Sequence, residues 1–406
     1  MGIEEIRRVI KNGSEDEKIA LRDYFKKYGS TYEKEVEVHE ILVNTILNLN
    51  VEERIALSGI IGYPVFLRIC LIPKIRHRFP LLQDGAALII LDDENHILVQ
   101  QRMDNGKYGF SGGCQELGEE LTDVSIRECY EETGLMLNKE KIVDVYEVSG
   151  LSRRNSYPNG DVVVNNTALY IGYLADCEGN LRKDNESKEV SFKTLSFLEQ
   201  LPQEQKHESD FIEILKLYLQ GKNPRIQQPI LEMEELPVKG DMSFADYLYS
   251  LTPEQALVLA KQMGYHNFLM SSLDERIRDI FPHLEDKSIM VALNHDHVLV
   301  YDDGENISLP KQIQSVGETF EDALASFLGI NAECFKLALR LSGQECYMES
   351  ENGFVNAMVF EPTVYLEEQG SLRYVSIEEA KQLLSKEDNQ YLNAYLNKYT
   401  KNVKTY

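Results

Sequence analysis

The sequence predicts an α/β protein that contains two related copies of one unit, and three observations lead to this expectation. Of the 406 residues, 43% are hydrophobic, which suits globular cores and is too much for a disordered chain. Segments with helical and with strand periodicity alternate along the chain. Residues 49–84 match residues 251–286 without a gap, at a constant offset of 202. At about 150 residues per domain, the length allows two or three domains.

The repeat is carried by residue types that helical periodicity alone does not select. Three dipeptides recur at this offset: Gly62-Tyr63 as Gly264-Tyr265, Phe66-Leu67 as Phe268-Leu269, and Phe79-Pro80 as Phe281-Pro282. Chance resemblance between two amphipathic segments is the alternative, but it does not explain matched Gly, Tyr, Phe and Pro. We therefore interpret residues 41–220 and 242–398 as two copies.

The first copy begins with helices and continues into an α/β body. Residues 1–40 are charged with helical spacing and have no counterpart, which predicts one or two appended helices. Helical patterns follow at 41–62 and 65–78. Apolar runs at Gly85–Leu91 and His96–Gln101 flank an acidic turn and predict two strands.

A helix at 121–133 comes next. Gly134 suits the left-handed position after its end, and Leu135 can make the hydrophobic contact beyond it. Three strand-like segments follow, at Ile142–Val148, Val162–Leu174 and Val190–Leu195. Helices at 196–201 and 207–219 are expected to close the unit.

Charge and composition exclude several classes of function. With 42 Lys and Arg against 67 Asp and Glu the net charge is −25, which opposes binding to DNA or to an anionic membrane. No apolar stretch approaches the roughly 18 residues that span a bilayer, and the N-terminus has acids where a signal peptide is apolar. The six cysteines show no metal-type spacing. We therefore expect a cytoplasmic protein.

Three glutamates stand close together near the end of the predicted helix. Glu128, Glu131 and Glu132 are spaced i, i+3 and i+4, which places them on one helix face. Like charges at this spacing repel by about 0.2–0.5 kcal/mol per pair, and the helix C-terminus disfavours anions further. A solvated acidic face is the alternative reading. A divalent cation such as Mg²⁺ would remove the conflict, because it prefers carboxylate oxygens.

The segment 113–135 contains Gly113, Glu119, Arg127-Glu128, Glu131-Glu132 and Gly134-Leu135 at fixed spacing, with Cys129 among them. This pattern resembles the Nudix box at every defined position, although an aliphatic residue is more usual where Cys129 stands. The resemblance implies a Nudix α/β/α sandwich around a mixed sheet. It also implies Mg²⁺-dependent hydrolysis, with Mn²⁺ as an alternative, of a pyrophosphate bond in a nucleoside diphosphate derivative.

The same resemblance implies roles for particular residues. Glu128, Glu131 and Glu132 would be metal ligands, joined by the backbone carbonyl of Gly113. Glu119 and Arg127 would pair and fix the geometry between the loop and the helix. This agrees with the physics, because an anionic pyrophosphate meets an anionic site only when metal ions bridge the two.

Further candidate residues lie outside the box. Arg102 is expected to contact a phosphate, or else is an exposed residue at the end of a hairpin. Arg154 and Tyr157 lie in a loop that could hold a phosphate and stack a base, although an Asn-Gly pair in the same loop is also simply a turn signal. Glu186 is the candidate general base, with Glu189 or a solvated charge run as alternatives.

The second copy, at about 287–400, lacks the site. From Glu318 to Gly329 it has 11 residues where Glu119 to Gly134 has 15, a loss of about one helical turn. The positions of the three glutamates and of Gly112-Gly113 hold other residues: Ala323, Ser326, Phe327 and Lys311-Gln312. We predict that this copy is catalytically inactive. It would act as an intramolecular partner in a pseudo-dimer, with a homodimer as the alternative.

These expectations give a layout and a function. The predicted segments are an N-terminal helical region (1–82), a catalytic Nudix domain (83–220), a linker (221–241), a helical segment (242–286) and a degenerate Nudix-like domain (287–406). The predicted substrate is an ADP-ribose-like compound, a nucleotide sugar or a dinucleotide. The alternatives are a nucleoside-triphosphate pyrophosphohydrolase and a non-catalytic nucleotide sensor or scaffold. The complete box argues against the sensor.

Overall fold

The computed structural model describes residues 2–29, 36–156, 162–207, 209–222, 235–348 and 353–403. The chain forms two compact units, Met1–Phe281 and Pro282–Tyr406. The first unit includes most of the helical segment 242–286, which the sequence repeat had assigned to the second copy, 242–398. The finer boundaries between helical regions, linker and sheets stay predictions.

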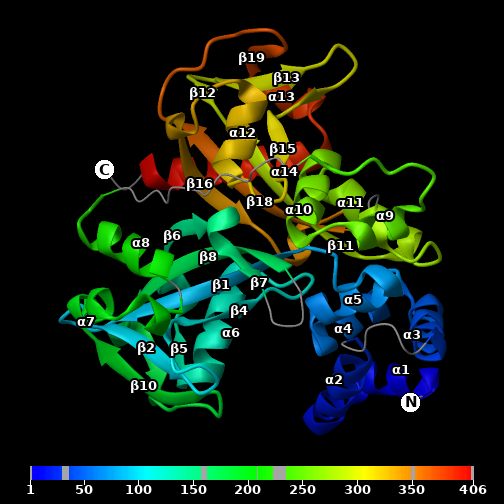
Figure 1. Ribbon diagram of the computed structural model, residues 1–406. Helices are drawn as coiled ribbons and strands as arrows, with labels where there is room; N and C mark the ends of the chain where they lie inside the picture. Colours follow the sequence, from blue (N-terminus) through cyan, green and yellow to red (C-terminus); the bar gives the residue numbers. More distant parts are fainter. Residues whose placement is uncertain are drawn as a thin grey trace. The chain divides into compact units, whose positions relative to one another are not determined.

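Five helices open the first unit (Figure 1): α1 (Ile3–Asn12), α2 (Glu15–Gly29), α3 (Val36–Asn48), α4 (Val51–Ile61) and α5 (Tyr63–Cys70). The two appended helices expected before residue 40 are α1 and α2. The single helix predicted at 41–62 is wrong, because Asn50 interrupts it. The Asn50 side chain accepts from the Glu53 N–H at 2.8 Å, and the Glu53 carboxylate accepts from the Asn50 N–H at 3.2 Å. This capping box starts a new helix.

The helix predicted at 65–78 is also shorter than expected. Its end at Cys70 is followed by a 3₁₀ turn, η1 (Pro73–Ile75), and Pro73 cannot continue an α-helix because it lacks an N–H. The first strand begins at Leu81, four residues before the predicted start at Gly85.

A mixed eight-stranded sheet follows, in the order β10-β2-β1-β8-β6, with β3 paired to β2, β4 to β1 and β7 to β8. Its strands are β1 (Leu81–Leu91), β2 (Ile97–Arg102), β3 (Tyr108–Gly109), β4 (Ser111–Cys114), β6 (Val143–Val148), β7 (Arg154–Ser156), β8 (Val162–Tyr173) and β10 (Ser187–Lys193). The pair β1–β8 is parallel and the other neighbours are antiparallel. The predicted mixed sheet is confirmed.

Helices cover both faces of this sheet and give an α/β/α sandwich (Figure 1). Alternate residues of β1, including Ala87, Ile89 and Leu91, pack against α7 (Leu195–Gln200) and α8 (Ser209–Leu219). The other face lies against α6 (Leu121–Thr133), whose bounds are those predicted. A small ribbon of β5 (Leu135–Leu137) and β9 (Cys177–Gly179) and the short turns complete the body: η2 (Lys139–Lys141), η3 (Leu151–Arg153), η4 (Leu174–Asp176) and η5 (Gln203–Gln205).

The second helical segment repeats α4 and α5 closely. It contains α9 (Phe244–Ser250), α10 (Pro253–Met263), α11 (Tyr265–Ser272) and η6 (Arg278–Ile280). The bounds of α10 and α11 are those of α4 and α5 shifted by 202. A capping box at Thr252 matches that at Asn50, and Gly264 has a φ of 75° where Gly62 has 92°.

The two helical segments meet through reciprocal contacts. The ring centroids of Phe66 and Phe281 lie 5.8 Å apart, and those of Phe79 and Phe268 lie 5.1 Å apart. Phe66 corresponds to Phe268 and Phe79 to Phe281 in the repeat, so the two pairs are equivalent contacts made in opposite directions. Leu71 and its counterpart Leu273 pair as an antiparallel bridge. A two-fold relation between copies produces this kind of reciprocity.

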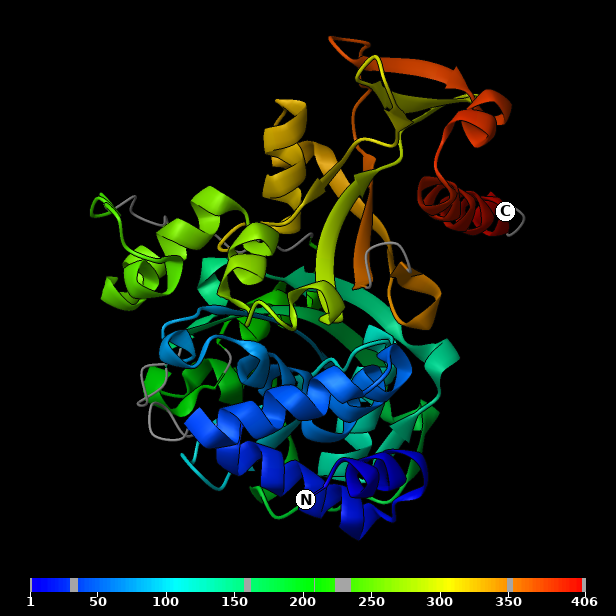
Figure 2. The ribbon, with the colours of Figure 1, turned by 90° about the vertical axis from the view of Figure 1, so that its right-hand side faces the viewer.

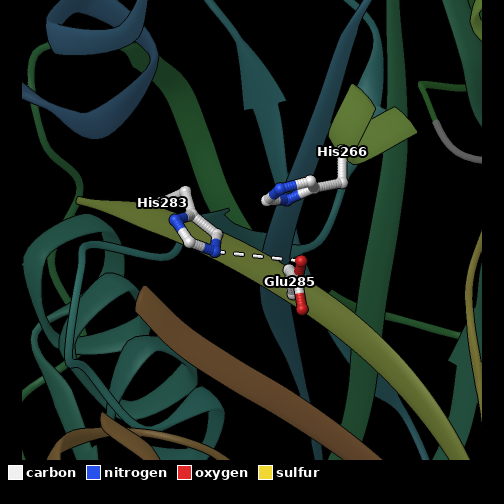
Figure 3. A group of neighbouring side chains, drawn as sticks. All are labelled: His266, His283 and Glu285. Atoms are coloured by element: carbon white, nitrogen blue, oxygen red, sulfur yellow. Dashed lines mark ion pairs between the residues drawn. The ribbon is translucent and has the colours of Figure 1, made fainter. Parts of the chain in front are cut away.

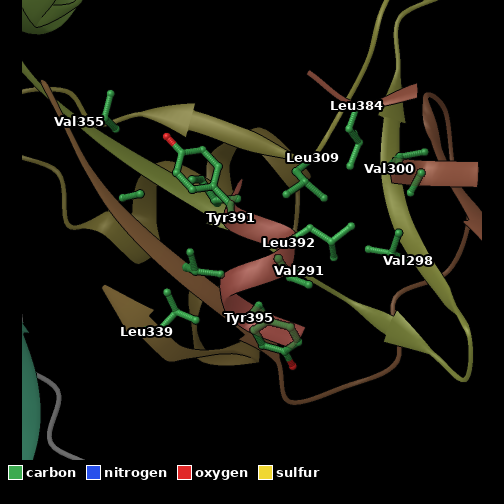
Figure 4. Packing of buried hydrophobic residues seen from close by; sticks show 14 of the residues in the cluster. Val291, Val298, Val300, Leu309, Leu339, Val355, Leu384, Tyr391, Leu392 and Tyr395 are labelled. Atoms are coloured by element: carbon green, nitrogen blue, oxygen red, sulfur yellow. The ribbon is translucent and has the colours of Figure 1, made fainter. Parts of the chain in front are cut away.

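The second unit has one mixed sheet, one antiparallel sheet and a core beside its last helix (Figures 2 and 4). The parallel pair β11–β18 occupies the place that β1–β8 holds in the first unit, and α12 and α14 lie on opposite sides of it (Figure 2). The sheets run β15-β11-β18-β16, with β17 on β18, and β12-β13-β14, with β19 on β13. This second set of sheets is compatible with the predicted tandem duplication.

The elements of the second unit are β11 (His283–Met290), β12 (Leu293–Asn294), β13 (His297–Asp302), β14 (Ile307–Ser308), β15 (Lys311–Ile313), α12 (Phe320–Leu328), η7 (Ala332–Cys334), β16 (Phe335–Leu341), η8 (Gln344–Cys346), β17 (Tyr347–Met348), β18 (Gly353–Pro362), β19 (Leu372–Ser376), α13 (Ile377–Leu383) and α14 (Lys386–Val403).

Buried charges pair along β11. The His283 Nε2 lies 3.8 Å from a Glu285 carboxylate oxygen (Figure 3), and Lys287 Nζ lies 3.6 Å from Glu285 and 3.1 Å from Glu387 on α14. The second unit therefore holds ion pairs where the first copy has Leu81, Gln83 and Gly85. Among the residues described, no helix combines the length and the apolar character needed to cross a membrane.

A buried histidine makes the first unit sensitive to acid. His39 accepts from Arg76 Nη2 at its Nδ1 (2.6 Å) and lies 3.1 Å from Asp274 through its Nε2. Burial, together with the Arg76 charge, lowers the pKa of His39 below its ordinary value of 6.5. The folded state therefore holds neutral His39, and below pH 6.5 the unfolded chain takes up a proton that the folded chain refuses.

We expect the free energy of unfolding to fall between pH 7 and pH 5, with a contribution that is absent from His39→Gln. Urea unfolding of both proteins at several pH values measures the two slopes. Equal slopes would show that His39 protonates as readily in the folded chain.

Candidate active site

The predicted box lies where β4 meets α6. The helix ends at Gly134, whose φ of 76° is left-handed as expected. Gly113 on β4 pairs with Ala86 of β1, and a Cβ built on Gly113 would collide with the Glu128 carboxylate. A glycine is therefore needed for this carboxylate to lie against the strand backbone.

Glu119 and Arg127 form the expected pair. Arg127 donates from Nε to one Glu119 oxygen at 2.8 Å and from Nη2 to the other at 3.1 Å. The same Nη2 reaches the Cys114 carbonyl at 3.3 Å. This two-pronged bond ties the loop before α6 to the helix and to β4.

Arg127 also contacts two of the candidate metal ligands. Its Nη1 donates to Glu128 at 2.6 Å and lies 3.6 Å from a Glu131 oxygen. The side chain of Glu128 is 17% exposed and that of Glu131 is 58% exposed. Among the described residues, the three glutamates do not bring one oxygen each within 4.8 Å of one another. One arginine thus balances part of the acidic patch.

The half-buried carboxyls of Glu128 and Glu132 resist ionisation. Burial raises the pKa of Glu132 to about 8, although Gln100 and the Gly112 N–H donate to it, and burial also raises the pKa of Glu128. Ionising both without a compensating cation is costly. Hard carboxylate oxygens beside a side-chain-free Gly113 are a donor set that fits Mg²⁺ or Mn²⁺.

Two contacts to this site were missed from the sequence. Gln100 on β2 donates from Nε2 to Glu132 at 3.0 Å, and the Gly112 N–H reaches the same oxygen at 3.3 Å. Ser187 on β10 in turn donates to Gln100 at 2.7 Å. The available signal was a buried amide directly after the apolar run Ile97–Val99.

Glu116 links the N-terminal helices to the same loop. Its carboxylate accepts from the Tyr63 N–H at the start of α5, at 3.0 Å, and the Glu119 N–H donates to its carbonyl at 3.0 Å. Burial raises the pKa of Glu116 to about 7. The position of α5 and the conformation of the loop are therefore coupled through one side chain.

Arg102 and Glu186 lie together at the edge of β2. Arg102 makes a two-pronged bond with Asp104, at 3.0 and 3.2 Å, and this bond, with weaker effects of Glu186 and Glu132, raises the pKa of Arg102. Glu186 is exposed, and its carbonyl accepts from the Met103 N–H at 2.6 Å. Arg102, the candidate phosphate ligand, is thus under the influence of the charges of Glu186, the candidate base, and of Glu132.

A family model described as NUDIX domain matches residues 81–217. An ADP-ribose pyrophosphatase from Methanocaldococcus jannaschii is 30% identical over 137 residues, which are 33% of this chain and 72% of that protein. The chain belongs to the Nudix family. This membership supports pyrophosphohydrolase activity in general, with a divalent metal ion.

Solved Nudix structures match about a third of the chain. A MutT NUDIX hydrolase from Burkholderia pseudomallei is 21% identical, with 32% of this chain and 95% of that chain covered and a TM-score of 0.26. A NUDIX hydrolase from Nitrosomonas europaea is 18% identical, with 36% and 97% covered and a TM-score of 0.28.

The remaining predicted substrate residues fall outside the Nudix box. Arg154 donates from Nη2 to Glu254 of α10 at 2.6 Å, so a carboxylate from the second helical segment engages it. Its neighbour Arg153 pairs with Asp210 of α8 at 3.1 Å. Tyr157 lies outside the described residues.

The second unit has a loop bonded like the one before α6, but it lacks the carboxylates of the Nudix box. Gln314 Nε2 donates to the Glu318 carbonyl at 2.7 Å, as Gln115 does to Glu119 at 2.8 Å. Its helix α12 has 9 residues against 13 in α6, and Gly329 ends it with a left-handed φ of 68°. Counted back from this glycine, the ligand positions hold Ala323, Ser326 and Phe327.

Replacing Gly113 by Ala tests the close approach of β4 to α6. The new Cβ would displace the Glu128 carboxylate, and a misplacement of about 1 Å can lower the catalytic rate about 100-fold. Nucleotide hydrolysis by Gly113→Ala measures this loss. Gly59→Ala is the control, because its Cβ meets nothing within 4 Å. An unchanged rate for Gly113→Ala would refute the assigned geometry.

Proposed function

We propose that this protein hydrolyses the pyrophosphate bond of a nucleoside diphosphate derivative, with an ADP-ribose-like compound first among the candidates, and that it uses Mg²⁺ or Mn²⁺. The complete acidic set of the box, with Glu128 half-buried against Gly113 and Glu132 half-buried beside Gly112, carries the proposal. The relative from Methanocaldococcus jannaschii favours ADP-ribose over a nucleotide sugar, a dinucleotide or a nucleoside triphosphate.

In this proposal, the chain supplies the ligands and their geometry. Glu128, Glu131, Glu132 and the Gly113 carbonyl hold the metal, which when bound polarises the phosphoryl oxygens and lowers the pKa of water. Glu119 and Arg127 fix the loop that connects α6 to β4, the strand that carries Gly113.

The neighbouring residues act on the substrate and on the proton. Glu186 is exposed and is proposed to accept the proton of the attacking water. Arg102 would leave Asp104 and bind a phosphate group of the substrate, because a phosphate, like a carboxylate, offers two oxygens to the two donors of the guanidinium.

Glu131→Gln and Glu132→Gln test the metal assignment. Each amide keeps the shape and removes the charge, so we expect turnover to fall by about 10²- to 10³-fold or more while the fold stays intact. Ser326→Ala is the matched control, because it alters the position in the second unit that corresponds to Glu131. A near-normal rate for either glutamine variant would contradict the assignment.

The products identify the substrate class. ADP-ribose would give AMP and ribose 5-phosphate, whereas a nucleoside triphosphate would give a monophosphate and pyrophosphate. Chromatography of reactions with Mg²⁺ and with EDTA separates these outcomes. Binding without release from any substrate would favour the nucleotide sensor.

The second helical segment is proposed to take the place of a partner molecule. The reciprocal contacts of Phe66 with Phe281 and of Phe79 with Phe268 support this, since one chain supplies both halves of a two-fold interface. We expect light scattering with size-exclusion chromatography to give the mass of one chain at micromolar concentrations. A stable dimer would favour the homodimer alternative.

A further inference from the structure

A buried relay of two side chains leads from β10 through β2 to Glu132. Ser187 Oγ donates to Gln100 Oε1 at 2.7 Å, and Gln100 Nε2 donates to Glu132 Oε2 at 3.0 Å. Ser187 is 0% exposed and Gln100 is 4% exposed. Water therefore does not compete for these bonds, and leaving either group unpaired would be costly.

The relay fixes which oxygen of Glu132 is engaged. Because Ser187 donates to the Gln100 carbonyl, the amide presents its NH₂ group to Glu132; the reversed amide would face the carboxylate with an oxygen. The Gly112 N–H donates to the same Oε2 at 3.3 Å. Two donors thus hold Oε2, and neither of them engages Oε1.

A β-bulge brings Ser187 into this position. In the pairing of β10 with β2, Ser187 stands opposite Arg102, but Glu189 stands opposite Gln101, so the register shifts between them. The bulge directly follows Glu186, the candidate base. It re-aims one side chain into the sheet, as bulges near active sites do.

The second unit shows what occupies these positions when the carboxylate is missing. Gln100 follows His96 by four residues as Tyr301 follows His297, and Glu132 precedes Gly134 by two residues as Phe327 precedes Gly329. The rings of Tyr301 and Phe327 lie 5.2 Å apart. An amide–carboxylate pair in one copy is thus an aromatic pair in the other.

We infer that Gln100, held by Ser187, is a positioning residue that sets the Glu132 carboxylate to bind a divalent cation. The inference rests on the proposed function, because it takes Glu132 as a metal ligand. Partners behind a metal ligand orient it, and their loss typically weakens metal binding about 10- to 100-fold. A purely structural bond would instead contribute to folding and leave metal affinity unchanged.

Mn²⁺ titration of the full chain, followed by electron paramagnetic resonance of the free ion, tests this role. For Gln100→Leu we expect about 10- to 100-fold weaker binding. For Ser187→Ala, the milder variant, we expect roughly 2- to 10-fold weaker binding. Gln101→Leu is the matched control, because its amide donates to the Gly106 carbonyl, away from Glu132.

Thermal unfolding in EDTA separates positioning from stability. A variant that unfolds near the wild-type temperature and still binds Mn²⁺ weakly has lost positioning. If Gln100→Leu and Ser187→Ala lower the unfolding temperature but the folded proteins keep wild-type Mn²⁺ affinity, the inference is overturned.

A double-mutant cycle keeps this test distinct from that of the proposed function. In a Glu132→Gln background, Gln100→Leu should weaken Mn²⁺ binding no further, because the two act through one carboxylate. If Glu132→Gln alone leaves binding unchanged, the metal assignment fails. If Glu132→Gln weakens binding and Gln100→Leu does not, only the positioning role fails.

Discussion

The crowding of carboxylates around α6 is the constraint on which the rest of the site depends. Of Glu119, Glu128, Glu131 and Glu132, the first two bond to one arginine, Arg127, and the third approaches it. Two of these acids are buried enough to raise their pKa values. The local architecture reduces this cost: Gly113 leaves room for a carboxylate, and Gln100 donates to another. A cation would offset what remains.

The sequence predicted those parts of the fold whose signals are local. The helix at 121–133 and the left-handed Gly134 agree with the structure because the box and the C-terminal glycine are contiguous. The break between α3 and α4 at Asn50 is also a local feature, but the apolar periodicity continues through it and predicted one helix. The capping bond of Asn50 ends that continuity and starts a new helix. By contrast, the bonds from Gln100 to Glu132 and from Arg154 to Glu254 join residues that are far apart in the sequence. Such contacts depend on how strands and helices pack, so a local sequence pattern does not predict them.

In the two units, the features that shape the loop before the helix differ from those that carry the proposed chemistry. The bond between the glutamine side chain and the Glu119 carbonyl recurs at Glu318, and so does the glycine that ends the helix. These features are present in the second unit, although its helix α12 has none of the candidate metal ligands. They therefore belong to the architecture, while the carboxylates and the amide behind Glu132 belong to the proposed reaction.

The second helical segment is part of the first compact unit, and this gives a physical reason for its retention. Phe66 and Phe79 are almost fully buried, and their ring partners Phe268 and Phe281 come from that segment. Burying an aromatic side chain contributes roughly 1.5–3 kcal/mol, so the loss of the segment would expose a large apolar surface. Glu254 of the same segment also engages Arg154 beside the Nudix sheet. The second helical segment is thus held within the first unit by buried ring contacts and by the bond between Glu254 and Arg154.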